Sequence, residues 1–362
     1  MRPLAALLAA FALAATPAAA APPSYTVLDL GTLGGSFSTG NGLNAAGWVT
    51  GWSFLPGNGA YHAFLHNGTT MVDLGTLGGS LSEGLGINAA GTVAGWSQLP
   101  GNGAYHTIRH DGAMTGLGTL GGIHSAGHSI NAAGAITGWS FLPGNVTQRA
   151  FVHNGSTMAD LGTLGGAGSF GNGINDSGQT TGWAHTAGNI QRAFRHDGST
   201  MTDLGTLGGS TSEGRGINAG GWVTGLADIA GNAAHHAFRH NGSTMLDLGT
   251  LGGTHSYGQA INDTGWVTGW AHGSGNQQLA FVHDGSTMYD LNDLIADTDP
   301  LDGLITLTSA SGINASGQIV ANSGTRSYLL TAVPANNEVP EPATMALFGV
   351  GLMGLAAVRR RT

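Results

Sequence analysis

The sequence predicts an all-β protein, a seven-bladed β-propeller, from three observations. A unit of 43 or 44 residues recurs seven times along the chain. Each unit divides into four short apolar segments separated by turn residues, which matches the size and content of one propeller blade. The seventh unit lacks its fourth segment, and a segment of that kind stands alone near the N-terminus. We expect the two ends to share one blade, because a closed ring leaves no exposed strand edge.

Composition is compatible with this fold and argues against nucleic-acid binding. The 362 residues include 65 glycines and no cysteine, yet 41% are apolar, which is enough for a core and argues against disorder. A β-solenoid or a different number of blades are the alternatives, although a solenoid would need distinct capping repeats. The formal net charge of −9 repels phosphate backbones and predicts no nucleic-acid partner.

The N-terminal residues 1–20 are predicted to be a signal peptide. Arg2 precedes an apolar run over residues 4–15, and the small residues of TPAAAA follow as a cleavage site. The alternative of a membrane anchor is disfavoured because the run is too short to span a bilayer. Residues 21–333 then form the exported propeller.

Two residues mark the repeat within residues 21–333. The leucine of the D-L-G step and the asparagine of the I-N step keep the same period, and no segment of the repeats shows a helical apolar period. In the second unit we expect strands over residues 85–88, 92–97 and 106–110 and a fourth that leads to Leu117. The leucines are Leu30, Leu74, Leu117, Leu161, Leu204, Leu248 and Leu291, and the asparagines are Asn44, Asn88, Asn131, Asn175, Asn218, Asn262 and Asn314.

The glycines are predicted to be joints. In N-A-A-G the asparagine and the glycine fit a type I turn, with the Asn side chain bonded to the backbone ahead. N-G and D-G pairs such as Asn67-Gly68 are predicted to supply the positive φ angles of two-residue hairpins. The G-T-L-G-G phrase is predicted to connect one blade to the next. A phosphate-binding role for these glycines would need a following helix, which the pattern lacks.

Recurrent histidines and tryptophans have both structural and functional interpretations. In A-F-x-H, the Phe and the His share one strand face, so we expect each His to be a hydrogen-bonded core residue and the residue between them to face outward. Shared metal binding is the alternative, and the sequence predicts no metal site and no cofactor. These histidines are His66, His110, His153, His196, His240 and His283.

Tryptophans fall into two groups. The regular group is expected in the core, with sugar stacking as the alternative: Trp52, Trp96, Trp139, Trp183 and Trp270. Trp48, Trp222 and Trp266 recur less regularly and are predicted to be ligand-facing. The acidic segment from Asp290 to Asp302 could supply oxygen ligands to Ca²⁺, but it lacks ordered D-x-D-x-D-G spacing, and this question stays open.

The C-terminus resembles the PEP-CTERM sorting signal of Gram-negative bacteria. Residues 334–339 form a linker, and Pro340, Glu341 and Pro342 are followed by an apolar segment and by a basic cluster of Arg359, Arg360 and Arg361. The apolar segment predicts a transient helical membrane anchor whose arginines stay at the cytoplasmic face; a permanent anchor is the alternative. The resemblance implies processing by an exosortase and delivery to the cell surface or extracellular matrix.

Phrases such as AFLHNGTTMVDLGTLGG, together with the I-N-x-x-G steps, resemble the HAF-repeat family of probable extracellular repeat proteins. The resemblance covers residues 25–333, although His stands where members often carry Trp after A-F-x. We therefore expect a non-catalytic structural or binding scaffold, with polysaccharide or a surface protein as partner. The alternative is a propeller lyase or hydrolase acting on glycans. Glu83 and Glu213 recur at one phase, and Arg215 and Asp228 depart from their repeats, but no nucleophile and base pair stands out.

Overall fold

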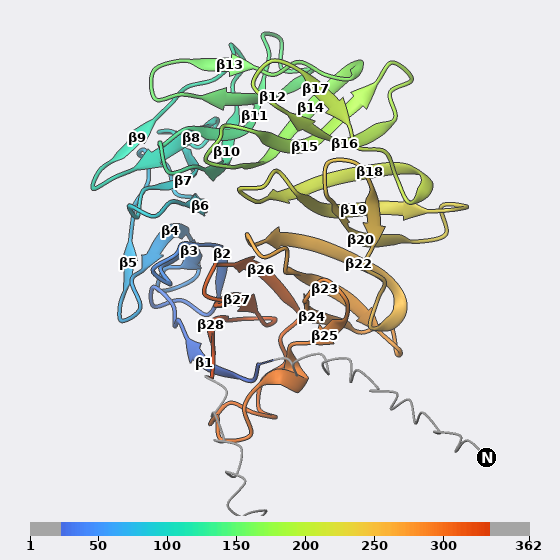
Figure 1. The fold of residues 1–362 in the computed structure, drawn as a ribbon. Helices are drawn as coiled ribbons and strands as arrows, with labels where there is room; N and C mark the ends of the chain where they lie inside the picture. Colours follow the sequence, from blue (N-terminus) through green and yellow to red (C-terminus); the bar gives the residue numbers. More distant parts are fainter. Residues whose placement is uncertain (1–22, 334–362) are drawn as a thin grey trace, which may run out of the picture.

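A computed structural model describes residues 23–333, which form a ring of seven four-stranded antiparallel sheets (Figure 1). The predicted seven-bladed all-β propeller is confirmed. Within residues 23–333 the only helix is the short 3-10 turn η1 (Asn292–Leu294), and no helix of this part is long and apolar enough to cross a membrane. The predicted helical segments at 1–20 and 340–362 lie outside the described residues.

Each of the first six blades uses four consecutive strands, ordered from the axis outward as in the sequence (Figure 1). The strands expected in the second unit are found, although the innermost begins three residues earlier than expected. The bounds are β2 (Ser38–Leu43), β3 (Val49–Phe54), β4 (Tyr61–His66) and β5 (Met71–Asp73) in blade 1; β6 (Ser82–Ile87), β7 (Val93–Gln98), β8 (Tyr105–His110) and β9 (Met114–Gly116) in blade 2; β10 (Ser125–Ile130), β11 (Ile136–Phe141), β12 (Gln148–His153) and β13 (Met158–Asp160) in blade 3; β14 (Gly165–Ile174), β15 (Thr180–Thr186), β16 (Gln191–His196) and β17 (Met201–Asp203) in blade 4; β18 (Gly208–Ile217), β19 (Val223–Ile229), β20 (His235–His240) and β21 (Met245–Asp247) in blade 5; β22 (Gly252–Ile261), β23 (Val267–Gly273), β24 (Gln278–His283) and β25 (Met288–Asp290) in blade 6.

The seventh blade joins the two ends of the chain, as predicted. It contains β26 (Ser309–Ile313), β27 (Ile319–Asn322) and β28 (Ser327–Ala332), and β1 (Tyr25–Asp29) forms its outer strand. β1 pairs antiparallel with β28 over five residues, from Tyr25 opposite Ala332 to Asp29 opposite Tyr328. Strand pairing between the termini therefore closes the ring.

The apolar core lies between neighbouring blades. One cluster combines Ala237 and Leu248 of blade 5 with Val267 and Phe281 of blade 6. The cluster at the closure is built in the same way, with Leu30 and Phe64 packed against Val320 of blade 7. Because each blade buries its two faces against its two neighbours, the repeat is stable as a ring rather than as a single unit.

The asparagines of the I-N step form a second closed ring. Each side-chain amide donates to the backbone carbonyl of the equivalent asparagine in the next blade; the Asn44 amide, for example, lies 3.1 Å from the Asn88 carbonyl oxygen. The circle is completed where Asn314 donates to the Asn44 carbonyl oxygen at 3.1 Å. The intervening links run from Asn88 to Asn131, Asn175, Asn218, Asn262 and Asn314.

The same asparagines also hold their own turns, as predicted. The Asn44 Oδ1 accepts the backbone N–H of Ala46 at 3.0 Å and that of Trp48 at 2.9 Å. The bond to the next blade is an addition that a single repeat could not reveal. One side chain thus fixes a turn and joins two blades.

The hairpin turns between the third and fourth strands differ from the prediction in one respect. Only the glycine of the N-G pair has a positive φ, 95° at Gly68. Asn67 precedes the turn, and its Oδ1 accepts the backbone N–H groups of Thr69 and Thr70 at 3.1 and 3.0 Å. The asparagines with positive φ lie instead in the loops between the second and third strands, as at Asn58 with φ 57°.

Candidate binding site: the axial cavity

Each innermost strand carries a β-bulge that interrupts its pairing with the second strand. In blade 1 the register shifts between Gly40 and Gly42, so Asn41 is the extra residue. A bulge redirects a side chain without ending the strand. The residues at this position all line one cavity on the ring axis: Asn41, Leu85, His128, Asn172, Arg215, Gln259 and Ser311.

The axial cavity has a volume of about 430 Å³, within the range of small-molecule sites. The residue before the ring asparagine, such as Leu43, Ile87 or Ile130, lines this cavity in all seven blades, and in six of them it also lines a second cavity of about 280 Å³ at the N-A-A-G turns. A ring of apolar side chains therefore lies between the axial cavity, whose polar lining varies from blade to blade, and the second cavity, whose lining of turn residues repeats.

Two carboxylates lie beside the cavity, each held by an amide from the preceding blade. The Asn41 amide donates to Glu83 Oε1 and to the Gly84 carbonyl oxygen, both at 3.0 Å. The Trp96 indole N–H donates to Glu83 Oε2 at 3.0 Å. Burial raises the pKa of Glu83, and the hydrogen bonds from Trp96 and Asn41 oppose this effect. The carboxylate is thus fixed by neighbouring donors.

Asn172 and Glu213 repeat this arrangement on another side of the ring. The Asn172 amide donates to Glu213 Oε1 at 3.2 Å and to the Gly214 carbonyl oxygen at 2.8 Å. Asn172 is only 8% exposed, and its Oδ1 has no hydrogen-bond partner. A buried acceptor without a donor costs free energy, so this oxygen is suited to a donor from a ligand.

Arg215 and His128 give the cavity its remaining polar groups. Arg215 forms an ion pair with Glu213, with 2.8 Å between Nε and Oε1, and its guanidinium lies 5.0 Å from the centre of the Tyr257 ring. The His128 ring contacts Phe170 edge to face at 4.9 Å. Burial, with a smaller contribution from the Arg215 charge, lowers the pKa of His128 to about 3. His128 is therefore neutral, with one donor and one acceptor nitrogen.

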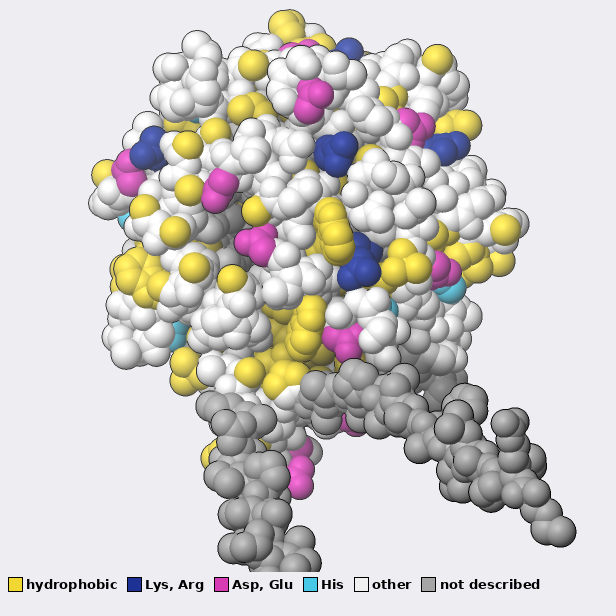
Figure 2. Space-filling model, in the orientation of Figure 1, with side chains coloured by type: hydrophobic (Ala, Val, Ile, Leu, Met, Phe, Trp, Pro, Cys, Tyr) yellow, Lys and Arg dark blue, Asp and Glu magenta, His cyan; other side chains and the backbone are white. Residues whose placement is uncertain are grey.

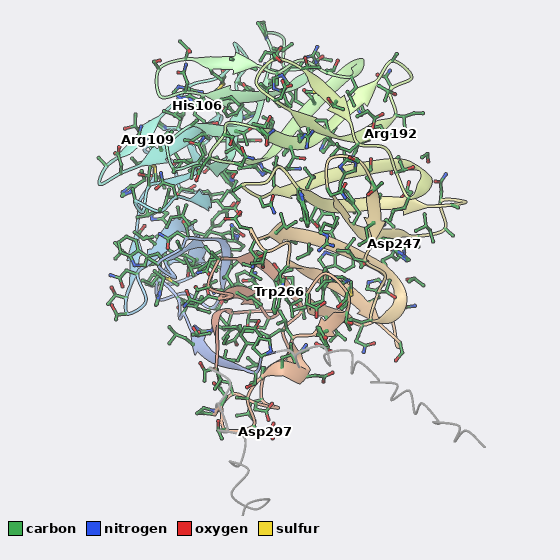
Figure 3. The ribbon with its side chains drawn as sticks, viewed as in Figure 1. His106, Arg109, Arg192, Asp247, Trp266 and Asp297 are labelled. Atoms are coloured by element: carbon green, nitrogen blue, oxygen red, sulfur yellow. The ribbon has the colours of Figure 1, made fainter. Side chains whose placement is uncertain are left out.

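The tryptophans predicted to be ligand-facing lie at contacts between blades. Trp48, Trp222 and Trp266 are half-buried and pack against the core of the following blade (Figure 3 labels Trp266). A Cβ on Gly91, whose φ is 81°, would lie 2.6 Å from the Trp48 ring, so glycine is required there. None of the three lines the axial cavity, and a ligand-facing role for them remains a prediction.

The regular tryptophans are half-buried and so do not lie in the core as expected. Trp52, Trp96, Trp139 and Trp183 belong to an arc of aromatic contacts that crosses blades 1 to 4, and Trp270 contacts His235 and Tyr257 separately. Trp52 lies 4.7 Å from Tyr61, which lies 6.3 Å from Trp96 in the next blade. The arc is interrupted where Leu226 occupies the position of tryptophan in blade 5. These aromatic side chains thus connect neighbouring blades and do not fill the centre of each sheet.

Five of the six recurrent histidines are buried and hydrogen-bonded, as expected. The Nδ1 of His196, for example, accepts the backbone N–H of Gly198 at 3.0 Å. Burial lowers the pKa of each of the five, which are His66, His153, His196, His240 and His283. Within residues 23–333 no group of three or more His, Asp or Glu side chains could hold a metal ion.

The residue between Phe and His does not face outward as predicted. In blades 4 and 5 it is an arginine that reaches the next blade, where Arg239 Nη1 donates to the Gly265 carbonyl oxygen at 3.0 Å. The Arg239 guanidinium also lies 5.0 Å from the centre of the Trp222 ring. In blade 6 the equivalent Val282 is only 1% exposed. The opposite strand face meets a neighbouring blade because both faces of each sheet are covered in the ring.

The acidic segment after β25 holds the closing strand. Asp299 Oδ2 accepts the Val27 N–H at 2.7 Å, and the Ala296 N–H donates to the Tyr25 carbonyl oxygen at 2.8 Å. Asp297 lies at the edge of the ring (Figure 3). The Asp228 carboxylate, another departure from the repeat, accepts both the hydroxyl and the backbone N–H of Thr211, at 2.7 and 3.1 Å. Asp299 therefore holds the closing strand, and Asp228 joins two strands of blade 5.

Sequence reasoning noticed Arg215, Glu83 and Glu213 but missed the cavity that they share. The available signal was the third residue before each ring asparagine, because it takes six residue types in seven copies while most of its neighbours repeat. Charged groups on the face seen in Figure 2 are scattered and form no patch of one sign. The axial cavity is thus where the repeated sequence departs most from symmetry.

One protein-family comparison matches the chain. The PEP-CTERM protein-sorting motif covers residues 338–361 and so includes Pro340 to Pro342 and Arg359 to Arg361, all outside the described residues. This motif indicates an exosortase-sorted extracellular protein of a Gram-negative bacterium. No curated protein sequence matches the chain.

Solved propellers resemble the fold at low sequence identity. The β-propeller domain of the Trilobed protease from Pyrococcus furiosus is 8% identical, with a TM-score of 0.51 over 84% of this chain and 98% of that domain. A gluconolactonase from Xanthomonas campestris is 13% identical (TM-score 0.41, 85% and 90% covered). The fucose-recognising lectin of Aleuria aurantia is 14% identical (TM-score 0.38, 72% and 96% covered). These likenesses concern the fold alone.

Proposed function

We propose that this protein is displayed at the cell surface or in the extracellular matrix as a non-catalytic scaffold that binds polysaccharide. The observation that carries the binding role is the axial position, where seven equivalent bulges present six kinds of side chain inside a repeated framework. A residue needed only for the framework would repeat as the ring asparagines do. The side chains at the bulges instead differ among the blades.

The state of the carboxylates supports a binding role over catalysis. Glu83 is bonded to Asn41 and Trp96, while Glu213 is bonded to Asn172 and paired with Arg215. A general acid or a nucleophile must be free to exchange a proton or attack a substrate. We also propose that the repeats belong to the HAF-repeat family, on the resemblance of their A-F-x-H and I-N-x-x-G phrases.

Sorting is tested in an exosortase-bearing Gram-negative host. Mass spectrometry of the extracellular protein is expected to show loss of the residues beyond the PEP motif, and changing Pro340 and Pro342 to Ala should leave a longer, membrane-retained form. An exosortase-deficient host is the control. Arg361 still present on the extracellular product would contradict the processing.

Binding is tested with the purified body, residues 21–333, on extracellular polysaccharide from the same host. We expect retention of the protein on immobilised polysaccharide without any change in polymer chain length or release of reducing ends. Cleavage products would establish the enzyme instead. No retention on any extracellular polysaccharide would remove the binding role.

A further inference from the structure

We infer that the axial cavity binds one neutral, polyhydroxylated sugar unit, which Asn172, His128 and Gln259 recognise through hydrogen bonds. The inference rests on the proposed function, since it names the ligand class of that surface. It goes further by placing recognition on the axis rather than on the tryptophans between blades.

The unpaired groups of the cavity match the hydroxyls of a sugar. Asn172 Oδ1 is a buried acceptor without a donor. Within residues 23–333, the side chains of His128 and Gln259 line the cavity and make no hydrogen bond to protein. These two groups supply both donors and acceptors, and a sugar hydroxyl can donate and accept at once. A site that offers both kinds of group at fixed positions therefore suits a ligand carrying several hydroxyls.

The charges around the cavity favour a neutral ligand. The Arg215 guanidinium is matched by Glu213 at 2.8 Å, and Glu83 adds a second carboxyl group behind Asn41. An anionic ligand would gain little from an arginine that is already paired and would meet the field of these carboxylates. A cationic ligand beside His128 would face the Arg215 charge, which also contributes to the lowered pKa of that histidine. Neutral hydroxyl groups avoid both costs.

Size and access are also consistent with a single sugar unit. The cavity volume of about 430 Å³ is near the lower end of small-molecule sites. The apolar ring of Leu43, Ile87 and equivalent residues narrows it toward the asparagine turns. A chain end or a branching sugar of a polysaccharide therefore fits better than an internal stretch of polymer.

The test uses titration calorimetry and saturation-transfer NMR on residues 21–333 with free monosaccharides as probes. The probes are glucose, galactose, mannose, rhamnose and fucose, with glucuronate and glucosamine as charged comparisons. We expect at least one neutral sugar to bind with 1:1 stoichiometry and more tightly than its charged relatives. Tighter binding of glucuronate or glucosamine would overturn the neutral assignment.

Two near-isosteric variants locate the site. His128→Phe keeps the ring against Phe170 and removes both nitrogens, while Gln259→Leu removes the amide; each should weaken binding about fivefold for one lost hydrogen bond. The double variant should lose about 25-fold in affinity, with its melting temperature unchanged. Val146→Thr, an equally conservative change at an exposed position outside the axial cavity, is the control and should bind normally.

Failure of the inference is distinguishable from failure of the proposed function. If the body retains polysaccharide but the double variant binds it as well as the wild type, the cavity is not the site and the scaffold role stands. Loss of binding in Trp48→Ala or Trp222→Ala instead would assign recognition to the contacts between blades. Absence of binding to every saccharide would overturn both.

Discussion

Removing the N-terminal strand tests the closure of the ring directly. A chain that begins at Gly35 lacks β1 and Leu30, and therefore two buried side chains, Tyr25 at 0% and Leu30 at 4% exposure. Their burial contributes about 1.5 to 3 kcal/mol each. Four further hydrogen bonds around the strand, including those from Val27 to Asp299 and from Ala296 to Tyr25, contribute about 1 kcal/mol each. The expected loss of about 7 to 10 kcal/mol is comparable with the whole stability of many domains.

The assay is thermal and urea unfolding, with light scattering to detect association through the exposed edge of β28. We expect the shortened chain to melt more than about 15 °C below the full body or to aggregate. The register permits a matched rescue: Val333 is bonded to Ser24 at 2.8 Å, so an Asn-Gly turn can join these two residues and place residues 24–30 after β28. This permuted chain should regain most of the lost stability. A monomeric shortened chain as stable as the full body would show that β1 does not hold the ring.

Two further predictions concern residues that repeat around the ring. Asn314→Ala and Asn131→Ala should each cost about 2 to 4 kcal/mol in urea unfolding. Each removes the hydrogen bond to the next blade and leaves a backbone N–H of its own turn without a partner, while the carbonyl in the next blade keeps a bond from its own turn. An Asn314→Ala variant as stable as the wild type would mean that the link across the closure does not contribute. Burial lowers the pKa of the buried histidines in the folded protein below the ordinary value of 6.5. The unfolded chain therefore binds more protons than the folded protein in acid. The free energy of unfolding should be at its full value above about pH 6.5 and should fall as the pH drops through the folded pKa values. Each histidine adds a slope of up to about 1.4 kcal/mol per pH unit, and His196→Gln should flatten the dependence measured by urea unfolding between pH 4 and 7, whereas an unchanged slope would contradict the assignment.

Sequence periodicity was sufficient for the architecture because it reports local geometry. The D-L-G leucines and I-N asparagines count the blades, and the isolated segment at Tyr25 predicts the closure that its pairing with β28 confirms. The PEP-CTERM signal was likewise readable, since a sorting motif is recognised as a linear sequence. Errors arose where a residue meets another blade: Arg239 was expected to face outward but donates a hydrogen bond to the Gly265 carbonyl oxygen of blade 6.

The sequence by itself determined the number of blades, the strand that closes the ring and the destination of the protein. Tertiary structure alone decided what lies on the axis, because residues such as Asn41 and Asn172 come from blades far apart in the chain and share a cavity only after closure. It also decided which polar groups are satisfied: Asn172 is one of many asparagines in the sequence, and only the bulge and the neighbouring Glu213 leave its Oδ1 buried and unpaired. Repetition fixes contacts between adjacent units, whereas a binding site arises from the differences among units that the ring brings together.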